Sequence, residues 1–252
     1  MNASLSEVSG FIDALLDIQN VPDWPHALNG LQLANRGEVT KIGAAVDAGG
    51  PTVKKAIAEG VDLLLVHHGL FWQGLQPLTG GHFRKIAAAI RADLAIYSAH
   101  LPLDVHPALG NNALLCQALG LAPTEPFFFD KGRRLGLRAA TSMPLDDLVS
   151  LVEKAVAGPV KVVRGGPKTA ACVGVVTGGA GAEIARAAGE GVDTFITGEG
   201  PHWAAIAAEE LEVNLILAGH YATETFGVKA LAAHVAERFG MPWVFIDHPT
   251  GL

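Results

Sequence analysis

Cysteine is scarce in this sequence, because the chain of 252 residues contains only Cys116 and Cys172. The two are far apart, and neither belongs to a CxxC or CxxH pattern. Such usage is typical of small buried side chains in a reducing compartment. We therefore expect two free thiols that are buried.

Charged residues are also few. They make up 17% of the chain, the net charge is -7, and there is no run of Lys and Arg. Proteins that bind the phosphate backbone of nucleic acids carry clustered Lys and Arg on one face. Nucleic acid is therefore not an expected partner.

Long hydrophobic runs are absent as well, although 50% of the residues are apolar. No stretch approaches the roughly 18 uninterrupted apolar residues of a membrane span, and no basic segment precedes an apolar one at the N-terminus. Leu5, Val8, Ile12 and Leu16 instead recur at helical spacing, which predicts an amphipathic helix. We expect a cytoplasmic protein with a sizeable core and no membrane partner.

The sequence contains an internal repeat. Residues 41–69 have the pattern of a strand, a Gly-rich turn, a helix and a second strand, which is a βαβ unit. A shift of 131 positions lays it over a stretch within residues 171–200, and the EGVD that begins at Glu59 then meets the EGVD that begins at Glu190. In this alignment His68 falls on Glu199.

The repeat continues at a shift of 120 positions, which lays residues 201–224 over residues 81–104. His100 then meets His220, and Asp104 meets Glu224. One alternative is that two βαβ units resemble each other through their Ala and Gly content alone. The coincidence of the polar positions argues against that alternative.

Alternating strands and helices predict an α/β protein with mostly parallel sheets flanked by helices. We expect two similar βαβ-type halves, residues 1–122 and 123–252, arranged about a pseudo-dyad. The segment 123–168 carries strands and a helix of its own, and the strand at 243–247 is a candidate to pair with the first half.

Histidines and carboxylates follow the predicted strands. In a parallel sheet, ligands gather at the carboxyl ends of the strands. His67 and His68 end one strand, and two others are followed by a His-x-x-x-acid group, which is His100 with Asp104 and His220 with Glu224. A lone histidine pair favours ordinary packing, whereas two such groups at equivalent places in a repeat favour a metal site.

Local geometry refines this site. Adjacent histidines on an extended strand point to opposite faces, so a shared site requires the chain to turn between Val66 and Gly69. Pro102 predicts that the LPLD segment is a loop. Glu224 is expected near a helix N-terminus, where a carboxylate is favoured.

Imidazole and carboxylate together suit Zn, Mn, Fe, Co or Ni, whereas Ca prefers oxygen ligands throughout. In a pair of ions one carboxylate usually bridges, and a shared water becomes acidic enough to act as a nucleophile near neutral pH. Glu224 is the candidate for the bridging carboxylate.

Five segments of the sequence resemble those of a known family. They are NGLQL (29–33), GVDLLLVHHGLFW (60–72), YSAHLPLDVHPALGNN (97–112), GVDTFITGE (191–199) and AGHYATE (218–224). With them the chain resembles the NIF-three-like dinuclear metal-centre hexamer family, whose members are often labelled GTP cyclohydrolase 1 type 2 homologues. The resemblance extends in order from about residue 29 to the C-terminal FIDHP.

The resemblance implies a duplicated α/β fold without an inserted third domain. It also implies two divalent metal ions per chain and a homo-oligomer, a toroidal hexamer with the sites facing its cavity. The family's ligands carry over onto a set in which Glu224 contacts both ions; the set is His67, His68, Asp104, His220 and Glu224.

Other residues receive weaker predictions. His100 is a candidate for a catalytic or substrate role, and Glu199 for acid/base duty or for support. Trp72 is expected to be a wall of the pocket, and Asn29 is a candidate for a substrate or a turn role. His202 shares the neighbourhood of Glu199, whereas ordinary surface or core positions are expected for His26, His82, His106, His234 and His248.

The leading hypothesis is a metal-dependent hydrolase of a nucleotide or related small molecule. The first alternative is a non-enzymatic metal-binding or regulatory scaffold. The second is a nucleotide-dependent oxidoreductase, because residues 174–185 have a strand, a Gly-rich turn and a helix. That turn is not G-x-G-x-x-G, and the equivalent turn of the first copy contains Pro51.

Overall fold

The computed structural model describes residues 2–251, and these form two compact units. The first unit comprises residues 2–103 and Gly227–His248, and the second comprises Asp104–Phe226 and residues 249–251. The predicted halves 1–122 and 123–252 follow the repeat in the sequence, whereas these units follow the contacts. The halves therefore stay a prediction.

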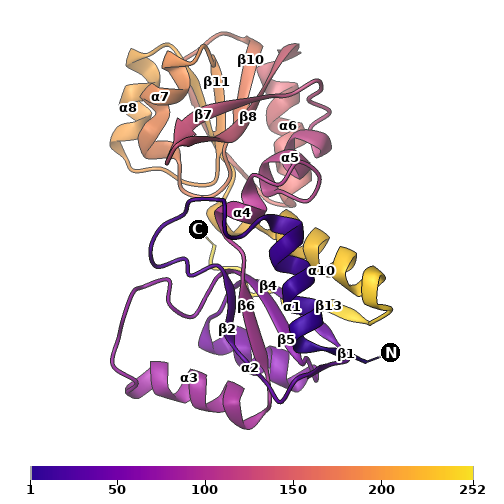
Figure 1. The fold of residues 1–252 in the computed structure, drawn as a ribbon. Coiled ribbons are helices and arrows are strands. Elements are labelled where there is room, and N and C mark those ends of the chain that lie inside the picture. The colour runs from indigo at the N-terminus through magenta and orange to yellow at the C-terminus, as the bar shows by residue number, and fades with distance from the viewer. Residues whose placement is uncertain (1, 252) are drawn as a thin grey trace. The chain divides into compact units, whose positions relative to one another are not determined.

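The first unit is built on a five-stranded sheet (Figure 1). The strand order is β13 (Trp243–Phe245), β4 (Ile42–Asp47), β5 (Leu63–His68), β6 (Ala95–Ser98) and β2 (Gly30–Leu33). The strands β13, β4, β5 and β6 are parallel, and β2 is antiparallel to β6. A short antiparallel pair joins β1 (Ala3–Ser4) and β3 (Glu38–Val39).

Helices cover both faces of this sheet. Leu64, Val66 and Ile96 pack in one core cluster with apolar residues of α2 (Gly50–Ala58) and α3 (Gly80–Arg91). Tyr97 follows Ile96 and so points to the opposite face, where its hydroxyl donates to Asp13 of α1 (Leu5–Leu16) over 2.6 Å. The helix α10 (Thr225–Phe239) contributes ring contacts to Phe11 of α1.

The N-terminal helix is confirmed. It begins with a capping box in which Ser4 and Glu7 satisfy each other's backbone N–H groups. Its buried apolar residues Leu5, Val8, Ile12 and Leu16 are the four that the periodicity selects.

The second unit is built on a six-stranded mixed sheet. The strand order is β7 (Glu125–Asp130), β8 (Arg133–Pro144), β10 (Thr169–Val175), β11 (Thr194–Thr197), β12 (Asn214–Leu217) and β9 (Lys161–Arg164). Only β10, β11 and β12 are parallel to one another. The strands β7, β8 and β9 pair antiparallel because they come from the segment between the two copies of the repeat.

The repeat is visible in both units. In the first, the order is β4, α2, β5, α3 and β6; in the second it is β10, α7 (Ile184–Gly189), β11, α8 (Trp203–Glu210) and β12. A short 3-10 helix, η1 (Gly181–Glu183), precedes α7. The predicted α/β class is confirmed, with one largely parallel sheet and one mixed sheet.

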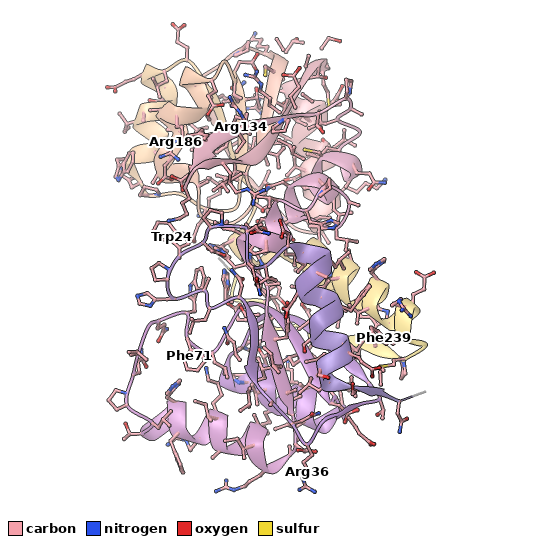
Figure 2. All side chains as sticks on the ribbon, in the orientation of Figure 1. Trp24, Arg36, Phe71, Arg134, Arg186 and Phe239 are labelled. Atoms are coloured by element: carbon pink, nitrogen blue, oxygen red, sulfur yellow. The ribbon has the colours of Figure 1, made fainter. Side chains whose placement is uncertain are left out.

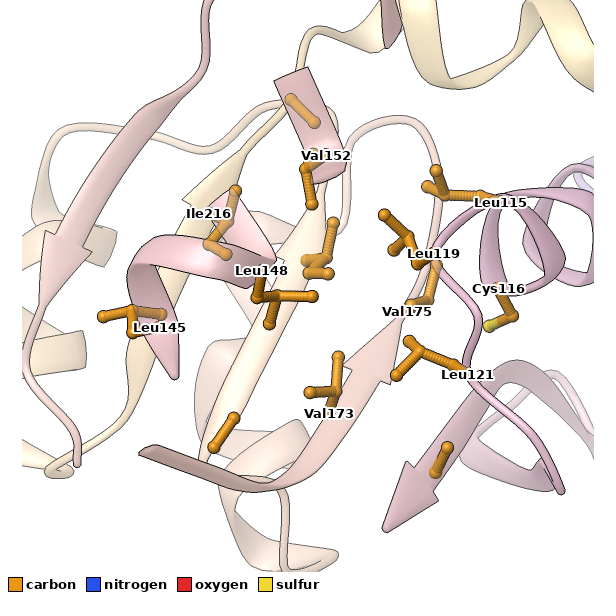
Figure 3. Close-up of a cluster of buried hydrophobic side chains, with 14 residues drawn as sticks. Leu115, Cys116, Leu119, Leu121, Leu145, Leu148, Val152, Val173, Val175 and Ile216 are labelled. Atoms are coloured by element: carbon orange, nitrogen blue, oxygen red, sulfur yellow. The ribbon is translucent and has the colours of Figure 1, made fainter. Parts of the chain in front are cut away.

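Two apolar clusters fill the second unit. The helices α5 (Asn111–Ala118) and α6 (Leu145–Val156) pack on the face of the sheet that carries Val173, Val175 and Ile216 (Figure 3). On the other face, Phe127 and Phe195 pack with the apolar residues of α7 and α8. Burial of each such large side chain stabilises the fold by roughly 1.5–3 kcal/mol.

One predicted loop is instead a helix. LPLD forms the short helix α4 (Leu101–Asp104), although Pro102 was expected to prevent it. Pro102 lies in the first turn, where a missing N–H breaks no hydrogen bond within the helix. The prediction was wrong because a proline interrupts a helix only beyond that turn.

Cys116 is buried and Cys172 is partly buried, and both are free thiols. Between residues 2 and 251, none of the helices combines the length and the hydrophobicity that crossing a membrane requires.

Candidate metal centre

Three histidines of the first unit gather where two neighbouring strands end. His67 and His68 are the last residues of β5, and His100 follows β6. The imidazole of His67 lies 4.9 Å from that of His68 and 4.8 Å from that of His100, measured between ring centroids. Their ligand atoms all lie within 4.8 Å of one another, so this group can hold a metal ion.

The strand continues through His68, which pairs in register with Asp47 of β4. The turn that we expected between Val66 and Gly69 does not occur before the strand ends at His68, so the prediction that the two histidines need such a turn to share a site was wrong. Side chains on a strand lean along its direction, so imidazoles on opposite faces still meet beyond the strand's end.

All three imidazoles are held through Nδ1. That nitrogen lies 2.9 Å from the carbonyl oxygen of Ala99 in His67, 2.9 Å from Oδ1 of Asp47 in His68, and 2.8 Å from Oδ1 of Asp23 in His100. A carbonyl or carboxylate oxygen can only accept, so Nδ1 carries the proton. In the neutral ring, Nε2 then holds a lone pair that can bind a cation. Metal-binding histidines are typically oriented in this way.

A small polar network fixes the position of His100. Asn29 accepts the backbone N–H of His100 over 2.7 Å and donates to Asp23 over 2.8 Å. Asp23 also accepts the backbone N–H of Leu101 over 2.9 Å. Burial raises the pKa of Asp23, but the hydrogen bond and charge of His100, with the bonds from Asn29 and Trp24, outweigh it and lower this pKa below its ordinary value.

Aromatic side chains border the histidines. The Trp72 ring lies 4.4 Å from His68 and 4.5 Å from His100, measured between centroids. Phe71, labelled in Figure 2, packs against the apolar core of the same unit. Trp72 therefore lies directly against two of the imidazoles, and with His68 it lines a pocket.

The second unit carries a His and two carboxylates in contact. His220 opens α9 (His220–Thr223), Glu199 follows β11, and Glu224 lies between α9 and α10. Nδ1 of His220 lies 2.9 Å from Oε1 of Glu199, and its Nε2 lies 3.1 Å from Oε1 of Glu224. Burial lowers the pKa of His220, but the hydrogen bonds and charges of Glu224 and Glu199 outweigh it and raise this pKa to about 9.

Glycine makes room for the carboxylate of Glu224. Gly178 has a positive φ of 74°, and a Cβ there would collide with Oε1 of Glu224. The backbone N–H of Gly178 donates to the hydroxyl of Thr223 over 3.1 Å, which ties this turn to α9. The close approach therefore depends on both the size and the backbone freedom of glycine.

Asp104 is a further candidate ligand of the second unit, and it is buried. Its Oδ1 accepts a hydrogen bond of 2.7 Å from Nδ2 of Asn111 at the start of α5. Nδ2 of Asn112 donates to the carbonyl oxygen of Leu135 over 2.9 Å and so attaches α5 to β8. This carboxylate is held in place, as metal-binding carboxylates commonly are.

These donors fit a divalent transition metal or zinc, because they offer imidazole nitrogens and carboxylate oxygens that are oriented by hydrogen bonds. The first unit brings together His67, His68 and His100. The second brings together His220, Glu224 and Glu199 and fixes Asp104 through Asn111.

Several orienting residues were missed from the sequence. Asp47 ends β4, beside the strand that ends in the histidine pair. Because ligands gather at the carboxyl ends of parallel strands, its position could have been identified from the sequence. Asp23 lies in an irregular segment without a recognisable pattern. Asn29 was a candidate for a substrate or a turn role, and the structure shows that it bonds both Asp23 and the backbone N–H of His100.

Comparison with known proteins gives a consistent result. The sequence model of the family Duf34/NIF3 (NGG1p interacting factor 3) matches residues 3–250. A "GTP cyclohydrolase 1 type 2 homolog" of Deinococcus radiodurans is 41% identical over 98% of this chain and 94% of its own length. A protein of the same name from Pyrococcus abyssi is 42% identical over 98% of both chains.

Solved structures agree with these sequences. TTHA1606 from Thermus thermophilus superposes with a TM-score of 0.91 at 41% identity, covering 99% of this chain and all of its own. Reduced HcgD from Methanocaldococcus jannaschii superposes with a TM-score of 0.87 at 26% identity, covering 98% of this chain and 99% of its own.

Proposed function

Because the chain belongs to the Duf34/NIF3 family, we propose that it is a hydrolase that requires two divalent metal ions and acts on a nucleotide or a related small molecule. One observation carries this proposal. Four imidazoles, those of His67, His68, His100 and His220, are held through Nδ1 by an oxygen acceptor. Nε2 of each ring is then the nitrogen that would bind a cation.

The proposed ligands come from both units. His67 and His68 of the first unit bind the ions together with Asp104, His220 and Glu224 of the second. Glu224 would be the carboxylate shared by the two ions. The mixture of nitrogen and oxygen donors suits Zn, Mn, Fe, Co or Ni.

Two such ions would acidify a water molecule and polarise the bond that is hydrolysed. The chain's own residues orient the proposed ligands and transfer protons. Glu199 accepts a hydrogen bond from Nδ1 of His220, so Nε2 is the nitrogen that would have to give up its proton to bind a cation. This contact favours support over acid/base duty for Glu199.

His100 has a different part in the proposal. Asp23 and Asn29 fix its ring and its backbone, and Trp72 packs against its face. An imidazole held in this way can give a proton to, or accept one from, a substrate atom at Nε2. We assign His100 this catalytic role.

The assembly is part of the same proposal. We expect a toroidal homo-hexamer in the cytoplasm, with the metal sites facing a cavity that admits small molecules and excludes folded nucleic acids. Size-exclusion chromatography with light scattering measures the oligomeric state directly.

The deciding experiment combines metal analysis with activity. Purified protein is analysed for bound metals, stripped with a chelator, and assayed against a nucleotide panel after addition of Mn, Zn, Co or Fe. We expect about two ions per chain and a hydrolytic activity that disappears on chelation and returns with metal, while the oligomer persists.

Two variants and a control sharpen this test. His67→Gln and His220→Gln are expected to lose bound metal and activity together. His234→Gln changes an exposed histidine that stacks on Phe11, and it should retain both. A protein with metal but no activity on any substrate would support the scaffold alternative, and one that binds no metal would contradict the proposal.

A further inference from the structure

The second unit contains a cavity of about 410 Å³ beside Asp104. One wall is the chain from Asp104 to Pro107, and the other is the hairpin of β7 and β8, including Arg133 and Arg134. Asp104 is a proposed metal ligand, so the cavity adjoins the place where the reaction is proposed to occur. None of the roles assigned above uses its remaining residues.

The hairpin turn determines where the two arginines point. Lys131 and Gly132 have positive φ angles of 47° and 80°, as in the two-residue type I′ turn that suits the twist of paired strands. Directly after this turn, the backbone of Arg133 on β8 is the register partner of that of Asp130 on β7. Successive side chains of a strand point to opposite faces, so Arg133 and Arg134 lie on different faces of β8.

Arg134, labelled in Figure 2, has a counter-ion. Its Nη1 donates to Oε2 of Glu190 over 2.8 Å, and Glu190 lies at the end of α7. Arg133 therefore points to the face that carries α5, on the side of Asp104. The positive charge of Arg134 is balanced, and the charge of Arg133 is available to the cavity.

Arg133 lacks a protein partner. Its side chain makes no hydrogen bond or ion pair with any residue in the described range 2–251, and its Nε is buried without an acceptor. A buried N–H donor without an acceptor is unfavourable. A guanidinium in this state beside a cavity is suited to receive an anion.

His106 also lines the cavity. Its Nδ1 accepts the backbone N–H groups of Ala108 and Leu109, over 3.2 and 3.0 Å, which fixes the ring beside this wall. Across the cavity, Oδ1 of Asp104 is already engaged by Asn111.

We propose that this cavity binds a phosphate group of the substrate, with Arg133 as its principal ligand. The planar guanidinium offers paired N–H groups that match two phosphate oxygens. This inference rests on the proposed function, because it places the substrate beside Asp104. It specifies the substrate class as phosphorylated.

Binding of inorganic pyrophosphate, measured by calorimetry, tests the proposal on the full-length protein with and without added metal. Loss of a charged hydrogen-bond donor commonly weakens binding by roughly 10- to 100-fold, and we expect Arg133→Gln to show this in both preparations. The pyrophosphate affinity of Arg133→Lys should lie between those of the unmodified protein and Arg133→Gln, because lysine keeps the positive charge but lacks the paired N–H groups of the guanidinium.

Arg164→Gln is the matched control, since Arg164 is an exposed arginine of the same unit that pairs with Asp146. It should bind pyrophosphate like the unmodified protein, and the melting temperatures of all variants should agree. Unchanged binding by Arg133→Gln, an equal loss in Arg164→Gln, or equally tight binding of malonate would overturn the proposal.

The two proposals fail separately. If the protein binds no metal but loses pyrophosphate binding in Arg133→Gln, the hydrolase proposal fails and the phosphate site stands. If metals bind and nucleotides are hydrolysed while Arg133→Gln binds pyrophosphate normally, only the phosphate site fails.

Discussion

Nδ1 of His68 lies 2.9 Å from Oδ1 of Asp47, and the two residues are register partners on adjacent parallel strands. A backbone pairing thus places the carboxylate at the ring nitrogen that has to keep its proton. The sheet itself orients this proposed metal ligand.

Replacement of Asp47 by Asn tests this arrangement. The amide oxygen can still accept from Nδ1, but the negative charge that makes the imidazole a stronger ligand is lost. We expect metal affinity to fall by roughly tenfold or more, as is usual for such partners. Competition with a chromogenic chelator measures the change.

Asp146→Asn is the control, because Asp146 is an exposed carboxylate that pairs with Arg164. It should leave the affinity unchanged. Equal affinities for Asp47→Asn and the unmodified protein would show that Asp47 does not tune His68.

Gly178→Ala is predicted to disturb metal binding through Glu224. The new Cβ collides with Oε1 of that carboxylate, and the residue also has a positive φ that L-residues adopt with strain. We expect a destabilisation of about 1–2 kcal/mol together with a loss of bound metal. Chemical denaturation and metal analysis provide the two readouts.

The strain alone is measured by Gly120→Ala. Gly120 has a φ of 69°, and a Cβ there has nothing within 4 Å. It should show a comparable destabilisation with full metal content. A Gly178→Ala protein that is destabilised but still binds metal fully would show that Glu224 can move without consequence.

The stability of the first unit should depend on pH through Asp23. Its pKa is lower in the folded protein than the ordinary value of 3.8, so its ionised form stabilises the fold. That contribution is present above the unfolded pKa of about 3.9 and is lost as the pH falls through the lower folded value.

Urea unfolding of the unmodified protein and of Asp23→Asn, from about pH 7 down to about pH 3, checks this expectation. The unmodified protein should be the more stable at neutral pH, and the difference should shrink only below about pH 4. A difference that is constant throughout would refute a contribution from ionised Asp23.

The two thiols should react slowly in the folded protein. Burial raises the pKa of Cys116 to about 12, and burial also raises the pKa of Cys172. At pH 8, roughly one Cys116 in ten thousand is the reactive thiolate. With Ellman's reagent, both thiols should react promptly only after denaturation.

Cys172→Ser isolates the buried thiol. In this variant Cys116 should react no faster than the protein unfolds. Prompt release of one equivalent from the native variant would contradict the burial of Cys116.

Much of the fold was predictable because the repeat fixes the order of strands and helices. His67 and His68 were predicted to belong to a site because two His-x-x-x-acid groups follow strands at equivalent places in the repeat, whereas the histidine pair alone would have favoured ordinary packing. The rule that locates them at the carboxyl edge also applies to Asp47, at the end of the adjacent strand.

Other features depend on contacts that no local pattern encodes. Asp23 and His100 are joined across an irregular segment of the chain, and only the folded structure brings them together. The antiparallel strands β7, β8 and β9 were recognisable as strands, but their places in the sheet follow from tertiary packing. Pro102 shows that the exact position of a proline within a helix decides its effect.

The first unit is discontinuous, and this bears on how the protein is synthesised. Its edge strand β13 pairs with β4, although about 200 residues separate them in the chain. A nascent polypeptide therefore exposes the unpaired edge of β4 to the cell until residues 243–245 leave the ribosome, whereas the continuous part of the second unit, Asp104–Phe226, emerges earlier. Translation that stops short of β13 would leave β4 open to pairing with other chains.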